Sequence, residues 1–125
     1  VLRRLKGEAE ASEFGQELFD VMFDDMDWSL REMGAGDMGV GKRVKAMVQA
    51  FYGRVAAYDK GMSGEGEIAG EGLREALVRN LYRTAQPAPE TVARMADHIW
   101  GEARHLASVD TGRIMSADFV FGDLP

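Results

Sequence analysis

The sequence has 125 residues, of which 46% are hydrophobic, with 21 acidic against 15 basic side chains and a formal net charge of -6. This length predicts a single domain over residues 1–125 with one core. The absence of cysteine excludes disulfides, a thiol nucleophile and a cysteine-ligated metal or iron–sulfur cluster. The acidic balance argues against binding to DNA. No window holds the roughly 18 to 20 apolar residues of a membrane-spanning helix, so at most peripheral membrane association is expected.

An acidic amphipathic helix is predicted from an N-cap at Ser12 to a stop at Gly34. Asp27 and Arg31 are spaced for an i,i+4 ion pair on its polar face. The apolar stripe recurs at helical spacing, and it consists of Leu18, Phe19, Met22, Phe23, Met26, Leu30 and Met33. Its methionines suit either an irregular core or an adaptable surface for apolar clients.

A second helix is predicted to begin at Asp37 or Met38 and to end near Gly61, with no acidic residue between positions 38 and 58. Its core-facing stripe is Val40, Val44, Met47, Phe51, Val55 and Tyr58. Gly34, Gly36, Gly39 and Gly41 surround the turn between the two helices. A sharp turn that needs positive φ and close approach of two backbones explains these glycines.

The same glycines match two nucleotide-binding patterns in part. Gly34, Gly36 and Gly39 fit G-x-G-x-x-G, and residues 36–42 fit most of a P-loop. Both motifs require a preceding strand, whereas a helix is predicted here, and Arg43 stands where a P-loop has Ser or Thr. Nucleotide binding is therefore not expected.

A loop is predicted over residues 61–72, followed by two further helices separated by a break at Pro87 and Pro89. The third helix has an apolar side of Leu73, Ala76, Leu77 and Leu81. The fourth runs from Pro89 to about Ser108 and turns inward Val92, Met95, Ala96, Ile99, Ala103 and Leu106.

Helical periodicity fades after Gly112, so residues 114–125 are predicted to form an irregular or short strand-like tail on which Phe119 and Phe121 pack. No alternating pattern is long enough to form a sheet. The predicted fold class is all-α, a small antiparallel bundle of about four to five helices with an irregular C-terminal tail.

His98, Glu102 and His105 are spaced to share one face of the fourth predicted helix, and Glu102-x-x-His105 has the spacing of carboxylate-bridged metal bundles. Such sites need matching carboxylates from other helices, so ordinary rim residues are the preferred interpretation. No Ser, His and acid set has a spacing that indicates nucleophilic catalysis. We expect no metal, no cofactor and no enzymatic activity.

Segregated charge is typical of docking surfaces, although a solvated helix face is the plain alternative. The candidate partner-binding residues are Asp24, Asp25 and Asp27 on the acidic helix, Lys42, Arg43 and Lys45 on the basic one, and the aromatic pair Phe51 and Tyr52. The basic cluster suits an acidic partner or ribosomal RNA, and Phe51 is expected to lie in the core.

The segment DMDWSLREMGAGDMGVGKRVKAMVQAFYGR, residues 25–54, closely resembles the core of the ubiquinol-cytochrome c chaperone family. The resemblance extends from Val1 to about Trp100, and residues 30–34 and 41–45 are its most specific blocks. It implies a non-catalytic assembly factor that attends newly made cytochrome b, or another component of complex III, and promotes assembly of ubiquinol-cytochrome c reductase. In eukaryotic relatives it implies a small partner protein and contact with the organellar ribosome; here both points stay open.

Family members usually carry a further helical stretch before this point, so we expect that the chain lacks an N-terminal helical segment. Its Arg, Ala and Gly usage and the lack of a transit-peptide pattern favour a bacterial cytoplasmic protein, peripheral at the inner membrane. Two alternatives stay open. One is a structural homodimer that buries Met22, Met26 and Met33, and the other is a helical metal-binding protein that uses the His98, Glu102 and His105 set.

Overall fold

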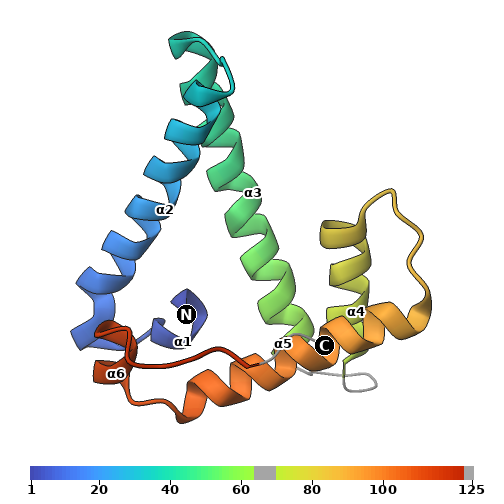
Figure 1. Cartoon of the computed structure of the whole chain (residues 1–125). Helices are drawn as coiled ribbons and strands as arrows, with labels where there is room; N and C mark the ends of the chain where they lie inside the picture. Colours follow the sequence, from blue (N-terminus) through green and yellow to red (C-terminus); the bar gives the residue numbers. More distant parts are fainter. Residues whose placement is uncertain (64–69, 123–125) are drawn as a thin grey trace. The chain divides into compact units, whose positions relative to one another are not determined.

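The computed structural model describes residues 1–63 and 70–122, and all the regular elements in them are helical (Figure 1). In chain order they are α1 Leu2–Leu5, the 3-10 helix η1 Ala9–Ala11, α2 Ser12–Glu32, α3 Asp37–Ser63, α4 Glu71–Leu77, the π-helix η2 Val78–Tyr82, α5 Pro89–Ser108 and α6 Thr111–Met115. The predicted all-α class is confirmed. None of the helices in the described ranges has both the length and the apolar character to cross a membrane.

The described chain divides into two compact units. The first is built from residues 1–50 and 106–120, and the second from the described parts of 51–105 and 121–122. The long helices α3 and α5 each contribute to both units, because the divisions fall after Ala50 and after His105.

The core of the first unit joins the beginning of the chain to its end. Leu5, Ala11 and Ile114 are buried together, and Phe14 and Phe119 pack against them. The prediction that Phe119 packs onto the helices is thus confirmed. The predicted irregular tail is wrong at Ile114 and Met115, which are the last two residues of α6. A helix of five residues is too short to show a period in sequence, and it begins because the Asp110 carboxylate accepts the backbone N–H groups of Gly112 and Arg113 at 2.9 and 3.3 Å.

Arg4 is the main polar link in this unit. Its Nε donates to the carbonyl oxygen of Leu106 at 3.0 Å, and one Nη donates to the carbonyl of Val109 and to Oγ1 of Thr111, each at 3.2 Å. The other Nη pairs with Glu8 at 2.9 Å. Since α5 ends at Ser108, the Leu106 carbonyl belongs to the last turn, where it also accepts the N–H of Val109 at 3.2 Å and where a cation is favourable.

We expect Arg4→Met to lower the free energy of unfolding by about 2 to 3 kcal/mol, because it leaves partly buried carbonyl groups without their charged donor. The matched control is Glu8→Gln, which removes only the half-exposed ion pair and is expected to cost less than about 1 kcal/mol. Urea unfolding followed by circular dichroism measures both. Equal losses in the two variants would contradict the assigned role of the carbonyl contacts.

The second unit has its own core, made of Met62, Leu73, Leu77, Val92 and Ala96. The half-buried side chains packed against it are Tyr58, Tyr82, Met95, Ile99, Trp100 and Ala103. The predicted inward face of α5 is confirmed, as are the helix bounds at Pro89 and Ser108.

Leu81 does not join this core, contrary to the prediction, and is 51% exposed. The chain changes from α to π geometry at Val78, where the N–H of Arg83 donates to the Val78 carbonyl, five residues earlier, at 2.8 Å. A π turn adds a residue to the turn. Tyr82, five residues after Leu77, therefore packs on the core in place of Leu81.

The helix ends differ from the prediction in two further places. Ser12 is not an N-cap but the first residue of α2 with helical φ and ψ, because η1 leads directly into that helix. Residues 61–63 and 71–72 are helical where a loop was predicted, and residues 64–69 lie outside the described residues.

Gly61 in α3 lies against the first turn of α4. A Cβ atom at Gly61 would come within 2.7 Å of the Leu73 nitrogen and 2.8 Å of the Gly72 oxygen, both of them backbone atoms. The two backbones can approach this closely only where no side chain intervenes. This contact sets the position of Leu73, which is fully buried.

Gly61→Ala is expected to destabilise the second unit by about 1 to 3 kcal/mol, because backbone atoms cannot yield as a side chain can. Gly53→Ala is the matched control: Gly53 is an exposed glycine of α3 at which an added Cβ meets nothing within 4 Å. That change should instead stabilise the protein by about 0.5 to 1 kcal/mol. Chemical unfolding of the two variants gives the comparison, and a stabilised Gly61→Ala protein would contradict the close approach.

Candidate interaction surfaces

The predicted interaction residues lie on α2 and α3, which are joined by a Schellman turn. Gly34 has a φ of +85°, its N–H donates to the Arg31 carbonyl at 2.9 Å, and the N–H of Ala35 donates to the Leu30 carbonyl at 3.0 Å. Positive φ is thus confirmed at Gly34. The predicted close approach of backbones is wrong here, because a Cβ at any of the four turn glycines would meet nothing within 4 Å. Since α2 precedes these glycines, both nucleotide motifs lack the strand they require.

Arg31 connects the two helices across this turn. Its Nε donates to Asp27 at 2.5 Å, which confirms the predicted i,i+4 pair, and an Nη donates to Asp37, the first residue of α3. The hydrogen bond to Asp27, followed by that to Asp37, raises the pKa of Arg31 above its ordinary value. Arginine is charged at physiological pH with or without this shift, and the two bonds link the last turn of α2 to the start of α3.

The three acidic candidates have different environments. Asp24 and Asp25 are exposed, whereas Asp27 is half-buried and bonded to Arg31. Asp27 thus contributes to the turn, and Asp24 and Asp25 are the carboxylates of this group that face solvent.

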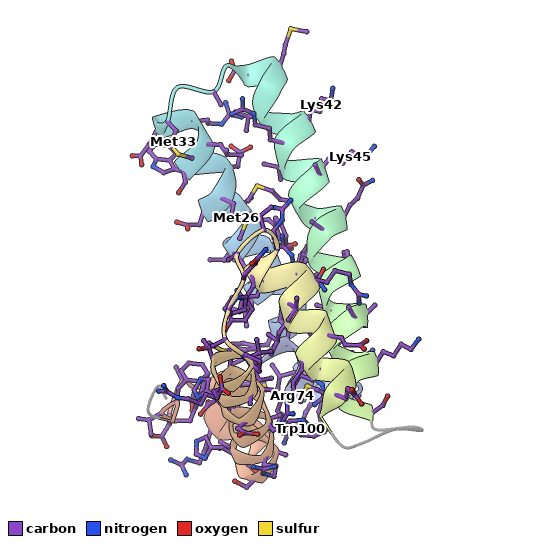
Figure 2. The ribbon with its side chains drawn as sticks, turned by 90° about the vertical axis from the view of Figure 1, so that its right-hand side faces the viewer. Met26, Met33, Lys42, Lys45, Arg74 and Trp100 are labelled. Atoms are coloured by element: carbon purple, nitrogen blue, oxygen red, sulfur yellow. The ribbon has the colours of Figure 1, made fainter. Side chains whose placement is uncertain are left out.

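The basic candidates are all available at the surface. Lys42, Arg43 and Lys45 are exposed on the first part of α3. Figure 2 shows Lys42 and Lys45 directed away from the ribbon into solvent. Side chains held in this way can meet a partner without any rearrangement of the helix.

The aromatic pair belongs to the second unit. Phe51 is half-buried, and its ring meets that of Tyr52 edge-on with the centroids 5.7 Å apart. Tyr52 is 58% exposed. Phe51 thus lies at the edge of the packed side of α3, and Tyr52 presents most of its ring to solvent.

The metal-ligand candidates on α5 do not form a metal site. One Glu102 oxygen accepts the N–H of Gly122 at 2.7 Å. Within the described residues, no three His, Asp or Glu side chains are arranged to hold a metal ion. Phe121, predicted to pack on the helices, is 62% exposed. The Glu102 contact has no signal in the sequence.

Exposed apolar side chains form a group that the sequence reasoning missed. Val21 and Trp28 are 65% and 64% exposed on α2. Neither residue belongs to the predicted apolar stripe of this helix. A large apolar residue outside the stripe of an amphipathic helix is the sequence signal that could have indicated an exposed apolar surface. Within the stripe, Met22 and Met26 are half-buried, while Met33 is 74% exposed; Figure 2 shows Met33 at the end of α2.

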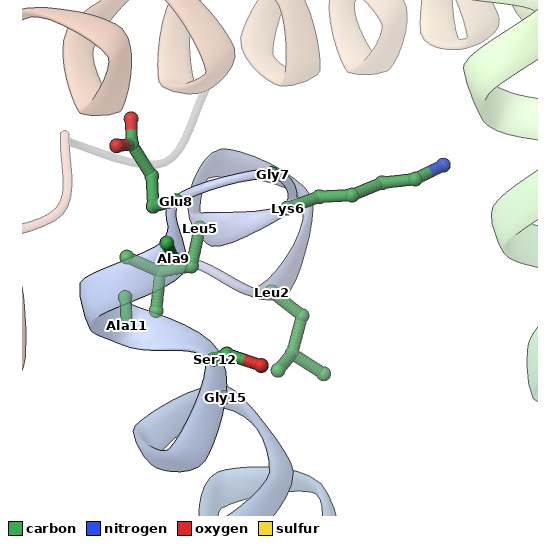
Figure 3. Close-up of a pocket in the computed structure, with 9 residues that line it drawn as sticks. All are labelled: Leu2, Leu5, Lys6, Gly7, Glu8, Ala9, Ala11, Ser12 and Gly15. Atoms are coloured by element: carbon green, nitrogen blue, oxygen red, sulfur yellow. The ribbon is translucent and has the colours of Figure 1, made fainter.

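A shallow cavity of about 370 Å³ lies beside α1, η1 and the start of α2 (Figure 3). Its lining consists of Leu2, Leu5, Lys6, Gly7, Glu8, Ala9, Ala11, Ser12 and Gly15. The side chain of Lys6 extends away from it in Figure 3, and Glu8 is paired with Arg4. This lining supplies no general acid–base pair and no activated nucleophile.

Comparison with known proteins decides the family. The family model described as ubiquinol-cytochrome C chaperone matches residues 1–121. The chain belongs to the ubiquinol-cytochrome c chaperone family. A crystal structure of the Cbp3 homolog from Brucella abortus is similar to it, with a TM-score of 0.82 and 32% sequence identity over 98% of this chain. No curated protein matches the sequence.

The chain spans 66% of the length of the Brucella abortus chain. The expected family is thus confirmed, and the similarity covers both compact units. The turn with its Schellman motif and the charged residues on either side of it lie inside the matched region.

Proposed function

We propose that the protein is a non-catalytic assembly factor that binds newly made cytochrome b and promotes assembly of ubiquinol-cytochrome c reductase, complex III. The observation that carries the proposal is the family match over residues 1–121. The exposed, unlike-charged faces of α2 and α3 support it, since such faces steer encounters between proteins.

The mechanism is transient shielding of the client. Apolar side chains of the factor cover client segments before haem and partner subunits bury them, and the charged faces orient the encounter. Lys42, Arg43 and Lys45 receive an acidic segment of the client or partner, and Asp24 and Asp25 receive a basic one. The factor works on the cytoplasmic side of a bacterial inner membrane, where a membrane-inserted client emerges.

Reversing the charge of Lys42, Arg43 and Lys45 to Glu is expected to reduce cytochrome b capture at least about tenfold, because attraction becomes repulsion. Helicity should be unchanged, since all three side chains are exposed. Affinity purification from the native host with mass spectrometry measures capture.

The matched control reverses Arg74, Arg79 and Arg94, three exposed residues of the second unit, so that the net charge changes equally. Capture at the wild-type level by the first variant would refute the basic docking face. If the wild-type protein recovers no component of complex III, the assembly function itself is wrong.

A further inference from the structure

The outward face of α2 carries two large apolar side chains. Val21 and Trp28 are seven residues apart, so they lie on the same side of the helix, roughly 10 Å apart along its axis. They lie opposite the stripe of Phe19, Phe23 and Met26, which faces inward. Tryptophan is among the residues most enriched in binding hot spots.

A rim of carboxylates surrounds this pair. Glu17, Asp24, Asp25 and Glu32 lie three or four residues from Val21 or Trp28, and all four are exposed. The only basic residue of α2 is Arg31, and its guanidinium is bonded to Asp27 and Asp37. Any partner on this face must therefore supply apolar side chains flanked by positive charge.

We propose that this face of α2 binds a basic amphipathic helix of a partner protein, with Val21 and Trp28 in contact with its apolar row and the four carboxylates in contact with its Lys or Arg residues. A helix suits the site because its own apolar side chains recur at the i and i+7 spacing of Val21 and Trp28. The inference rests on the proposed function, since it assigns this face to a protein that the assembly factor binds.

A second copy of the chain is a poorer occupant. The exposed basic side of α3 in the first unit presents Met38, Lys42, Lys45 and Gln49 in its outward row. Met38 is its single large apolar side chain and stands beside the turn, so this row cannot cover both Val21 and Trp28. An anionic membrane surface is also unsuitable, because it would repel the four carboxylates.

The test uses the full chain and a synthetic amphipathic helix of leucine and lysine, with a leucine and glutamate peptide of the same pattern for comparison. The chain has two tryptophans, so a Trp100→Phe background makes Trp28 the sole tryptophan reporter. We expect the lysine peptide to bind and to shift Trp28 emission to the blue, with affinity that falls as salt rises, and the glutamate peptide not to bind.

Trp28→Ser should weaken binding of the lysine peptide at least about tenfold, and Trp28→Phe should restore most of it. Leu81→Ser is the matched control, since Leu81 is a half-exposed apolar residue of the second unit. Equal affinity of Trp28→Ser and Leu81→Ser would overturn the proposal. A wild-type dimer that dissociates in Trp28→Ser, seen by light scattering, would assign the face to a second copy and would also overturn it.

Capture from the native host separates this inference from the function on which it rests. If Trp28→Ser binds the peptide and captures cytochrome b as well as the wild type does, the proposed α2 surface is refuted and the proposed assembly function stands. If the wild-type protein binds the peptide through Trp28 but recovers no complex III component, the proposed surface stands and the proposed assembly function is refuted.

Discussion

The guanidinium group of Arg4 holds together residues from the two ends of the sequence in the first unit. It donates to the carbonyls of Leu106 and Val109 and to the hydroxyl of Thr111, and it pairs with Glu8. These bonds hold the last turn of α5 and the start of α6 against α1. The buried cluster of Leu5, Ala11 and Ile114 forms beside them, and α2 starts directly from this cluster. The N-terminal end of α2, the helix with the acidic candidate residues, thus begins beside a contact between Arg4 and residues about a hundred positions away in the sequence.

The other end of α2 is fixed locally. The Schellman hydrogen bonds at Gly34 and the bonds from Arg31 to Asp27 and Asp37 specify how the chain leaves α2 and enters α3. Both ends of α2 are determined in this way. The fold therefore does not depend on ion pairs between the acidic outward face of α2 and the basic face of α3. Charges that the fold does not use in pairing remain available to a partner, and this is consistent with an assembly factor that acts by binding.

The surfaces on α2 combine charge with exposed apolar groups, and the two components have different roles. Exposed carboxylates steer an encounter and select against a like-charged partner, but each contributes little to affinity at physiological salt. A few desolvated side chains dominate the affinity of many interfaces, and tryptophan is enriched among them. Trp28 within a carboxylate rim therefore couples both properties on one helix face, without a pocket.

The sequence by itself determined the helical class, the bounds and inward face of α5, the Asp27 and Arg31 pair and the family. Those features depend on contacts within a few residues or on local spacing, which a sequence displays directly. Only the tertiary structure decided the rest. The Arg4 contacts join residues about a hundred positions apart. The π turn places Tyr82 on the core instead of Leu81. The backbone of α4 leaves no room for a side chain at Gly61. Each of these depends on which atoms the folded chain brings together, and no local period encodes that.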